Sequence, residues 1–191
     1  MVGRQFRMKQ IQETVKPEVA EKAAEEVLRP AYQQAEEPVL QSQALAFHRF
    51  IRFQIDDVEQ ETLKSPEITL RDGEGGVVDQ IVLLASMCVS KGISCRILRV
   101  SNEWQVHHIL EVLVQNETDV KAIGVDAEQH YPFRESRRQD GWYWTPADPR
   151  LCSRTGDLET LEKEDLIEKK SDGNRRYYEW VEISDRYSLR A

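Results

Sequence analysis

The apolar positions of the chain recur with two different periods, one typical of helices and the other typical of strands. Residues 77–90 are apolar nearly all round, which predicts a helix that is buried on most of its sides. Residues 38–56 place their apolar side chains at helical spacing, which predicts a second helix with one side facing the core. The expected core-facing residues are Leu40, Ala44, Phe47 and Ile51, with Phe50, Phe53 and Ile55 widening that side.

The N-terminal segment, residues 1–37, carries a thinner apolar stripe at helical spacing. From Pro17 onward this stripe consists of small and aliphatic residues near every fourth position, namely Val19, Ala23, Val27 and Ala31. Because Ala and Val bury little area, the stripe suits packing on a partner helix or on the flank of the chain's own domain. Two interpretations stay open: a helix docked on its own domain, or an arm used for assembly.

Two stretches alternate with a period of two residues, which predicts strands. The first covers residues 93–100 and the second residues 107–115. In the second stretch, alternation places His108, Leu110, Val112 and Val114 on the more apolar face, which is expected to lie in the core. We expect His107 to point at the start of the helix formed by residues 77–90.

The C-terminal part predicts an acidic helix over residues 158–170 and a final aromatic strand over residues 176–183. That strand either packs in the chain's own sheet or is offered to another subunit. The pattern therefore predicts an α+β fold in three parts. These are a helical arm at 1–37, a core domain at 38–155, and a helix and strand extension at 156–191.

A glycine-rich loop turns directly into the buried helix at Val77. The first residue of such a helix sits where unpaired backbone N–H groups and the positive end of the helix dipole converge. A cysteine at that position would be activated as a thiolate nucleophile. Here the position holds valine.

The loop and helix resemble the transglutaminase-like superfamily of cysteine enzymes. The residues that carry the resemblance are Ser65-Pro66-Glu67, Thr69-Leu70, Gly73-x-Gly75-Gly76-Val77-Val78-Asp79-Gln80, Leu83-Leu84-Ala85-Ser86, Gly92-Ile93-x-x-Arg96 and His107-x-x-x-Glu111-Val112. The chain more closely resembles the short members encoded by tailed viruses and prophages, over roughly Phe47 to Asp148. The resemblance implies a transglutaminase-like or papain-like core, with a central helix packed on a small antiparallel sheet.

The resemblance also assigns a degenerate catalytic triad. The family loop reads Gly-x-Gly-Asp-Cys-Asp-Asp, so Val77 takes the cysteine position and Gly76 and Val78 replace two acids, whereas Asp79 is kept. His107 takes the position of the catalytic histidine. Two residues are candidates for the third position, Asp126 and Asp148, and the shorter connection favours Asp126. The remaining positions implied for binding are Gly75, Gly76, Glu111 and Trp144.

These residues predict a catalytically inactive domain, because the isopropyl group of Val77 supplies no nucleophilic atom. The expected function is a structural or interaction module whose partners are other subunits of a tailed virion or an assembly. The alternative is an active acyl-transfer or amide-hydrolysing enzyme that uses a displaced nucleophile, Cys152, with His107.

The length, charge and cysteine content of the chain limit its possible partners, cofactors and location. A length of 191 residues fits one ordinary domain with an appended arm, and a net charge of -8 disfavours general nucleic-acid binding. The 3 cysteines show no metal-ligand spacing, so we expect no metal and no cofactor, and free thiols in a reducing interior. No run is long and apolar enough for a membrane span, and Met1 to Thr14 lacks the apolar segment of a secretory signal. We therefore expect the chain in a virion or in the host cytoplasm.

Overall fold

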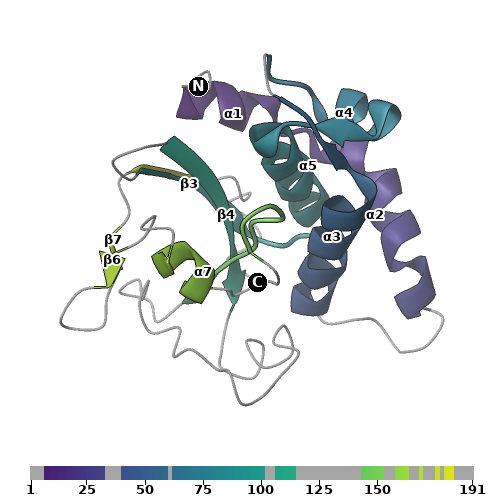
Figure 1. Ribbon diagram of the computed structural model, residues 1–191. Coiled ribbons are helices and arrows are strands. Elements are labelled where there is room, and N and C mark those ends of the chain that lie inside the picture. The colour runs from purple at the N-terminus through teal and green to yellow at the C-terminus, as the bar shows by residue number, and fades with distance from the viewer. Residues whose placement is uncertain are drawn as a thin grey trace.

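The computed structural model describes residues 7–32, 40–59, 62–101, 106–114, 143–152, 158–163, 168–169, 175–176 and 179–182. Most of its helices gather on one side of a four-stranded antiparallel sheet, and the short helix α7 lies on the other side (Figure 1). Helices and sheet are thus segregated rather than alternating along the chain. The predicted α+β class is confirmed.

Five helices precede the main sheet in the described part of the chain. They are α1 (Met8–Thr14), α2 (Pro17–Tyr32), α3 (Leu40–Gln54), α4 (Pro66–Asp72) and α5 (Val77–Ser90). Helix α5 has the bounds that its apolar pattern predicts. Helix α4 was not predicted, although its signals are present: Ser65 accepts a hydrogen bond from the backbone N–H of Ile68 at 3.5 Å, and Gly73 ends the helix with a φ of 67°.

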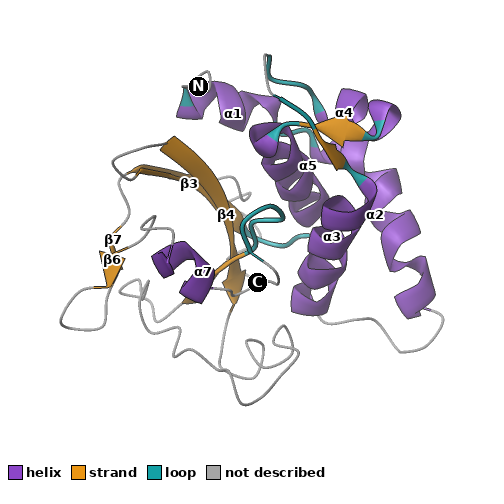
Figure 2. Ribbon diagram, viewed as in Figure 1, coloured by secondary structure: helices purple, strands orange, loops and turns teal. Residues whose placement is uncertain are grey.

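The main sheet has the strand order β5-β4-β3-β8, and every neighbouring pair is antiparallel. Its two long strands, β3 and β4, are labelled and drawn in orange in Figure 2. Its strands are β3 (Cys95–Ser101), β4 (Val106–Val114), β5 (Tyr143–Pro146) and β8 (Glu179–Glu182). Strand β8 pairs with β3, with Leu98 opposite Trp180. Of the two alternatives for the final strand, the structure therefore shows the one in which it packs in the chain's own sheet.

The smaller elements include one departure from the sequence pattern. Strands β1 (Asp56–Asp57) and β2 (Glu74–Gly75) pair in parallel, and β6 (Glu168–Lys169) pairs antiparallel with β7 (Arg175–Arg176). Helix α7 spans only Leu158–Lys163. The predicted helix over 158–170 is therefore too long, because residues 168 and 169 pair as a strand instead.

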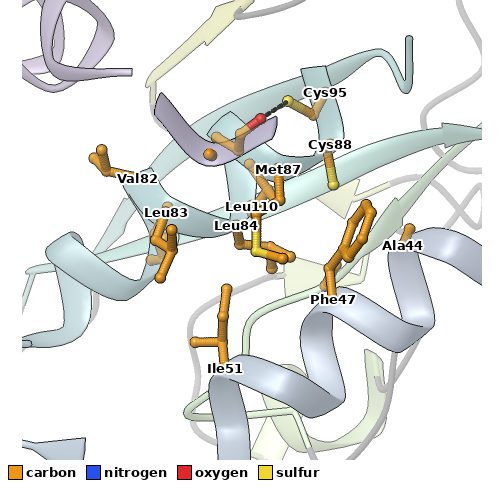
Figure 3. Close-up of a cluster of buried hydrophobic side chains, with 14 of the residues drawn as sticks. Ala44, Phe47, Ile51, Val82, Leu83, Leu84, Met87, Cys88, Cys95 and Leu110 are labelled. Carbon is orange, nitrogen blue, oxygen red and sulfur yellow. Dashed lines mark hydrogen bonds between the residues drawn. The ribbon is translucent and has the colours of Figure 1, made fainter. Parts of the chain in front are cut away.

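The hydrophobic core is built around α5, in which every residue from Val78 to Cys88 is buried. Phe47 and Ile51 of α3 reach this helix from one side and Leu110 of β4 from another (Figure 3). A helix that is apolar nearly all round is stable only when neighbours cover it on most sides. This covering by α3 and the sheet is what the sequence of α5 requires.

Helices α1 and α2 belong to the same core. Their buried apolar residues are Met8, Ile11, Ala20, Ala24 and Leu28. The linker between them is tied to α5 by a hydrogen bond of 3.0 Å from the backbone N–H of Lys16 to Oγ of Ser86. The N-terminal helices are therefore docked on their own domain, while the boundaries 1–37, 38–155 and 156–191 remain predictions.

The outer sides of α2 and α3 differ from the predicted pattern. On α2 the fully buried positions are Ala20, Ala24 and Leu28, one residue beyond the predicted stripe of Val19, Ala23 and Val27, which is only partly covered. On α3 the predicted core residues Ala44, Phe47 and Ile51 are buried, but Phe53 is 71% exposed. The prediction that Phe53 widens the core-facing side is wrong. Phe53 lies two residues after Ile51, which turns its side chain about 200° around the helix.

Candidate functional site

The start of α5 is organised by the buried carboxylate of Asp79. Its Oδ1 accepts a hydrogen bond of 2.7 Å from the backbone N–H of Lys64, and its Oδ2 accepts one of 3.0 Å from the backbone N–H of Gly76. Burial raises the pKa of Asp79, while the two backbone hydrogen bonds act in the opposite direction. Asp79 therefore closes the glycine-rich loop onto the first turn of the helix.

Gly75 fits into this loop because it has no side chain. A Cβ at that position would lie 3.0 Å from Cβ of Asp79 and 3.1 Å from Cγ2 of Thr69. The carbonyl of Gly75 accepts a hydrogen bond of 2.9 Å from the side-chain amide of Gln80. The close approach of Asp79 and Thr69 therefore explains why position 75 is a glycine.

Val77 is the first residue of α5 and is partly buried against the core. An isopropyl group has no lone pair and no dissociable proton, so Val77 cannot attack a carbonyl carbon. The structure places at this helix start a side chain that packs but does not react.

The thiols of the chain lie elsewhere and are enclosed. Cys88, Cys95 and Cys152 are all free and fully buried. Burial raises the pKa of Cys88 and of Cys95, which keeps both as neutral thiols at physiological pH. Cys152 ends the turn that begins at Asp148, where its backbone N–H donates a hydrogen bond of 3.1 Å to the carbonyl of Asp148.

His107 and Asp148 are brought together across neighbouring strands of the sheet. Nε2 of His107 lies 3.3 Å from Oδ2 of Asp148, within ion-pair distance but not aligned as a hydrogen bond. The other oxygen of Asp148, Oδ1, accepts hydrogen bonds of 2.8 Å from the backbone N–H groups of Arg150 and Leu151. Asp148 is the acid beside His107 in the structure, whereas Asp126 lies outside the described residues.

Helix α3 holds the Asp148 turn in place. Nε2 of His48 donates a hydrogen bond of 3.1 Å to the carbonyl of Asp148, and Nη1 of Arg52 donates bonds of 3.0 Å to the carbonyls of Pro149 and Cys152. Burial lowers the pKa of His48, so the imidazole donates in its neutral form. Sequence reasoning missed these positioning roles, because His48 and Asp148 are 100 residues apart and no local pattern links them.

Strand alternation separates the two histidines of β4. Leu110 and Val112 pack in the core that contains α5, as predicted, and His108 shares their face. His107 is therefore on the opposite face, together with Ile109 and Glu111. The arrangement with His107 in front of Val77 stays a prediction. The strand register does not favour it, because it puts His107 on the face of β4 opposite to the core that contains α5.

The other two residues implied for binding are placed in the sheet. Glu111 is 1% exposed and accepts a hydrogen bond of 2.7 Å from Nε of Arg96, which is 5% exposed, so the two form a buried ion pair between β4 and β3. Trp144 lies in β5 opposite Leu113. Glu111 therefore serves the packing of the sheet.

Within the described ranges, no group of three or more His, Cys, Asp or Glu side chains is arranged to hold a metal ion. The helices described above include none with the length and apolar character needed to cross a membrane. The comparisons with known proteins give no relative: no family model, no curated protein and no solved structure matches this chain.

Proposed function

We propose that this chain is a non-catalytic, transglutaminase-like interaction module that serves as a component of a tailed virion or of its assembly. The observation that carries the proposal is Val77, which opens the buried helix α5 at the place where a cysteine enzyme of this kind needs its nucleophile. The virion context rests on the sequence resemblance to proteins of tailed viruses and prophages.

The burial of the cysteines supports the absence of thiol chemistry. Cysteine catalysis requires a thiolate that a substrate carbonyl can reach, with a histidine base beside it. All three thiols are fully buried, and burial holds Cys88 and Cys95 in their neutral form. When a nucleophile is lost, the residual catalysis from binding and from oxyanion donors is small.

A second candidate is an acyl-transfer or amide-hydrolysing enzyme that uses Cys152 with His107. The observation that favours it is the contact between His107 and Asp148, in which a carboxylate could orient an imidazole base as in a catalytic triad. The observation against it is the burial of Cys152 at the end of the Asp148 turn. A substrate would have to open that turn to reach the thiol.

Thiol labelling of the folded chain distinguishes the two candidates. We expect a substrate-like chloroacetamide probe to label the folded protein only as fast as local opening exposes a thiol, and His107→Ala to leave that rate unchanged. Cys152→Ser identifies the labelled site, and Cys88→Ser serves as the matched control. Rapid labelling of Cys152 that is abolished by His107→Ala would overturn the non-catalytic proposal.

The virion context is tested separately by the composition of particles. We expect mass spectrometry of purified particles, or of assembly intermediates, from a virus encoding this chain to detect it in a fixed ratio to the other structural subunits. Its absence from both preparations would refute the virion part of the proposal and would leave the absence of thiol chemistry unaffected.

A further inference from the structure

The surface between α2 and α3 is hollowed into a groove with a volume of about 930 Å³. Its apolar lining comes from three helices and includes Val19, Ala23 and Val27 of α2, Phe50 and Phe53 of α3, and Leu70 of α4. The three residues of α2 are those of the predicted stripe that the domain's own core covers only partly. Packing inside the domain therefore leaves this second apolar side of α2 available for contact.

Phe53 is the most exposed residue of this apolar lining. Its side chain is 71% exposed, and among the described residues the only other exposed large apolar side chain is that of Ile68, at 36%. Aromatic side chains in apolar pockets are the usual energetic centres of protein interfaces. The groove thus combines a protruding aromatic anchor with a recess that has room for another one.

The two helices that form the groove carry opposite charge. Helix α2 contains Glu18, Glu21, Glu25 and Glu26 with only Lys22 and Arg29 as cations, whereas α3 contains Arg49 and Arg52 and no acid. The charged residues that line the groove are Lys22 and Glu26 of α2 and Arg49 of α3. In a contact about a two-fold axis, both copies use the same surface. If one residue of the first copy meets a second residue of the other copy, the reverse contact is also made, so the surface must be complementary to itself. Glu26 on one side of the apolar recess and Arg49 on the other satisfy that requirement as a pair, while Lys22 lies one turn before Glu26 on the same helix.

We propose that two copies of this chain associate through the groove between α2 and α3 about a two-fold axis. Phe53 of each copy enters the groove of the other, and Glu26 of each copy faces Arg49 of the other. The proposal deepens the interaction role proposed above and rests on it, since it names a second copy of the chain as the partner.

The size of the surface sets the expected strength. Helix α2 has 16 residues and is therefore about 24 Å long, so two parallel helix faces offer roughly 500 Å² per copy. Stable interfaces bury about 800 Å² per partner, so this contact is expected to be a weak one. We accordingly expect self-association in the micromolar range, with a large share of the binding energy carried by Phe53.

The first test measures the mass of the full chain by sedimentation velocity over a wide range of protein concentration. We expect a concentration-dependent monomer–dimer equilibrium that Phe53→Asp weakens by at least roughly 30-fold. Ile68→Asp is the matched control, since it places the same charge on an exposed apolar helix position outside the groove, and it should leave dimerisation unchanged. Thermal unfolding of both variants verifies that each remains folded.

The second test exchanges the two charges. Glu26→Arg and Arg49→Glu are each expected to weaken dimerisation by roughly 5-fold or more, since each creates like-charge contacts at two symmetric places. The double variant restores the opposite pairing and should regain most of the wild-type affinity. A monomer at every concentration, or equal weakening by Phe53→Asp and Ile68→Asp, overturns the proposed dimer. A monomer that still shows no thiol reactivity separates this failure from failure of the non-catalytic function.

Discussion

Two buried carboxylates, Asp79 and Asp148, occupy comparable places in the fold and are used differently. Each follows a change of chain direction, and each is at most 1% exposed. Asp79 has one backbone N–H on each of its oxygens. Asp148 receives both of its backbone N–H groups on Oδ1 and presents Oδ2 to the imidazole of His107. The difference is one oxygen atom that faces a titratable side chain instead of the backbone.

Because of this difference, Asp79 only holds a loop, whereas Asp148 also contacts a side chain that can exchange protons. A carboxylate whose two oxygens each accept a backbone N–H fixes the loop that carries those N–H groups. A carboxylate that holds its turn with one oxygen can orient an imidazole with the other, as in a triad. The carboxylate of Asp79 thus holds the start of α5, whereas the carboxylate of Asp148 both holds its turn and lies beside the imidazole of His107.

The largest expected effect is that of Asp79→Ala. The substitution leaves the backbone N–H groups of Lys64 and Gly76 without their acceptor, and each buried unpaired group costs about 1–3 kcal/mol. We expect the free energy of unfolding, measured in urea, to fall by about 4 kcal/mol. The control is Asp72→Ala, which removes a surface ion pair with Lys64 and should lower the free energy of unfolding far less. Equal losses for the two variants would mean that Asp79 does not hold the loop.

Lowering the pH should change the contributions of His108 and Asp79 to the free energy of unfolding in opposite directions. Burial, followed by the nearby charges of His107 and Arg99, lowers the pKa of His108 to about 4 from 6.5. The unfolded chain therefore takes up this proton at higher pH than the folded chain does, so stability is present at pH 7 and falls as the pH drops from about 6.5 to 4. The shift of His108 corresponds to about 3 kcal/mol.

The raised pKa of Asp79 works against this loss, because the folded chain binds that proton more readily than the unfolded chain. We expect His108→Gln to flatten the decline of the unfolding free energy between pH 7 and pH 4. Asp79→Asn should make the decline steeper, because it removes the opposing contribution. If both variants change the slope in the same direction, the assignment of the two groups is wrong.

The local elements around these acids could be predicted from sequence, but their partners could not. The glycine-rich loop and the bounds of α5 follow from a continuous apolar pattern that begins at Val77. Asp148 and its partners His107 and His48 belong to separate segments, and strand pairing alone determines which acid meets His107. The shorter connection favours Asp126, which lies outside the described residues, whereas the place of Asp148 beside His107 follows from the pairing of β4 with β5.

The same reasoning explains the one-residue shift on α2. Its stripe of Val19, Ala23 and Val27 and its buried row of Ala20, Ala24 and Leu28 have the same spacing. Adjacent rows on a helix differ by about 100° in direction, and the spacing alone does not determine which of the two rows is buried against a neighbouring helix. Close packing on α5 decides for the second row, which includes the larger Leu28, and the first row is left to line the groove.

A moderate effect is expected from Gly75→Ala, which tests how tightly the Asp79 loop is packed. The new Cβ would lie 3.0 Å from Cβ of Asp79 and 3.1 Å from Cγ2 of Thr69, so atoms that are themselves buried must move. We expect the unfolding free energy to fall by about 2 kcal/mol, the usual range for overpacking being about 1–3. Gly92→Ala is the control, since its φ of 72° adds strain but nothing lies within 4 Å, and it should cost about 1 kcal/mol. A larger loss at Gly92 would contradict the tight packing of the loop.

The smallest effect is expected from Asp148→Asn, which changes only the oxygen that faces His107. The amide oxygen can still accept the N–H groups of Arg150 and Leu151, so the turn is retained and the loss of stability should stay below about 1 kcal/mol. The amide NH₂ then faces Nε2 of His107, which must become an acceptor, and the imidazole should shift its proton to Nδ1. Nitrogen NMR of the imidazole detects this exchange of tautomers, while Asp79→Asn, with an NH₂ forced against a backbone N–H, should cost about 2 kcal/mol. Equal losses for the two asparagine variants, with no change of tautomer at His107, would show that Asp148 is as purely architectural as Asp79.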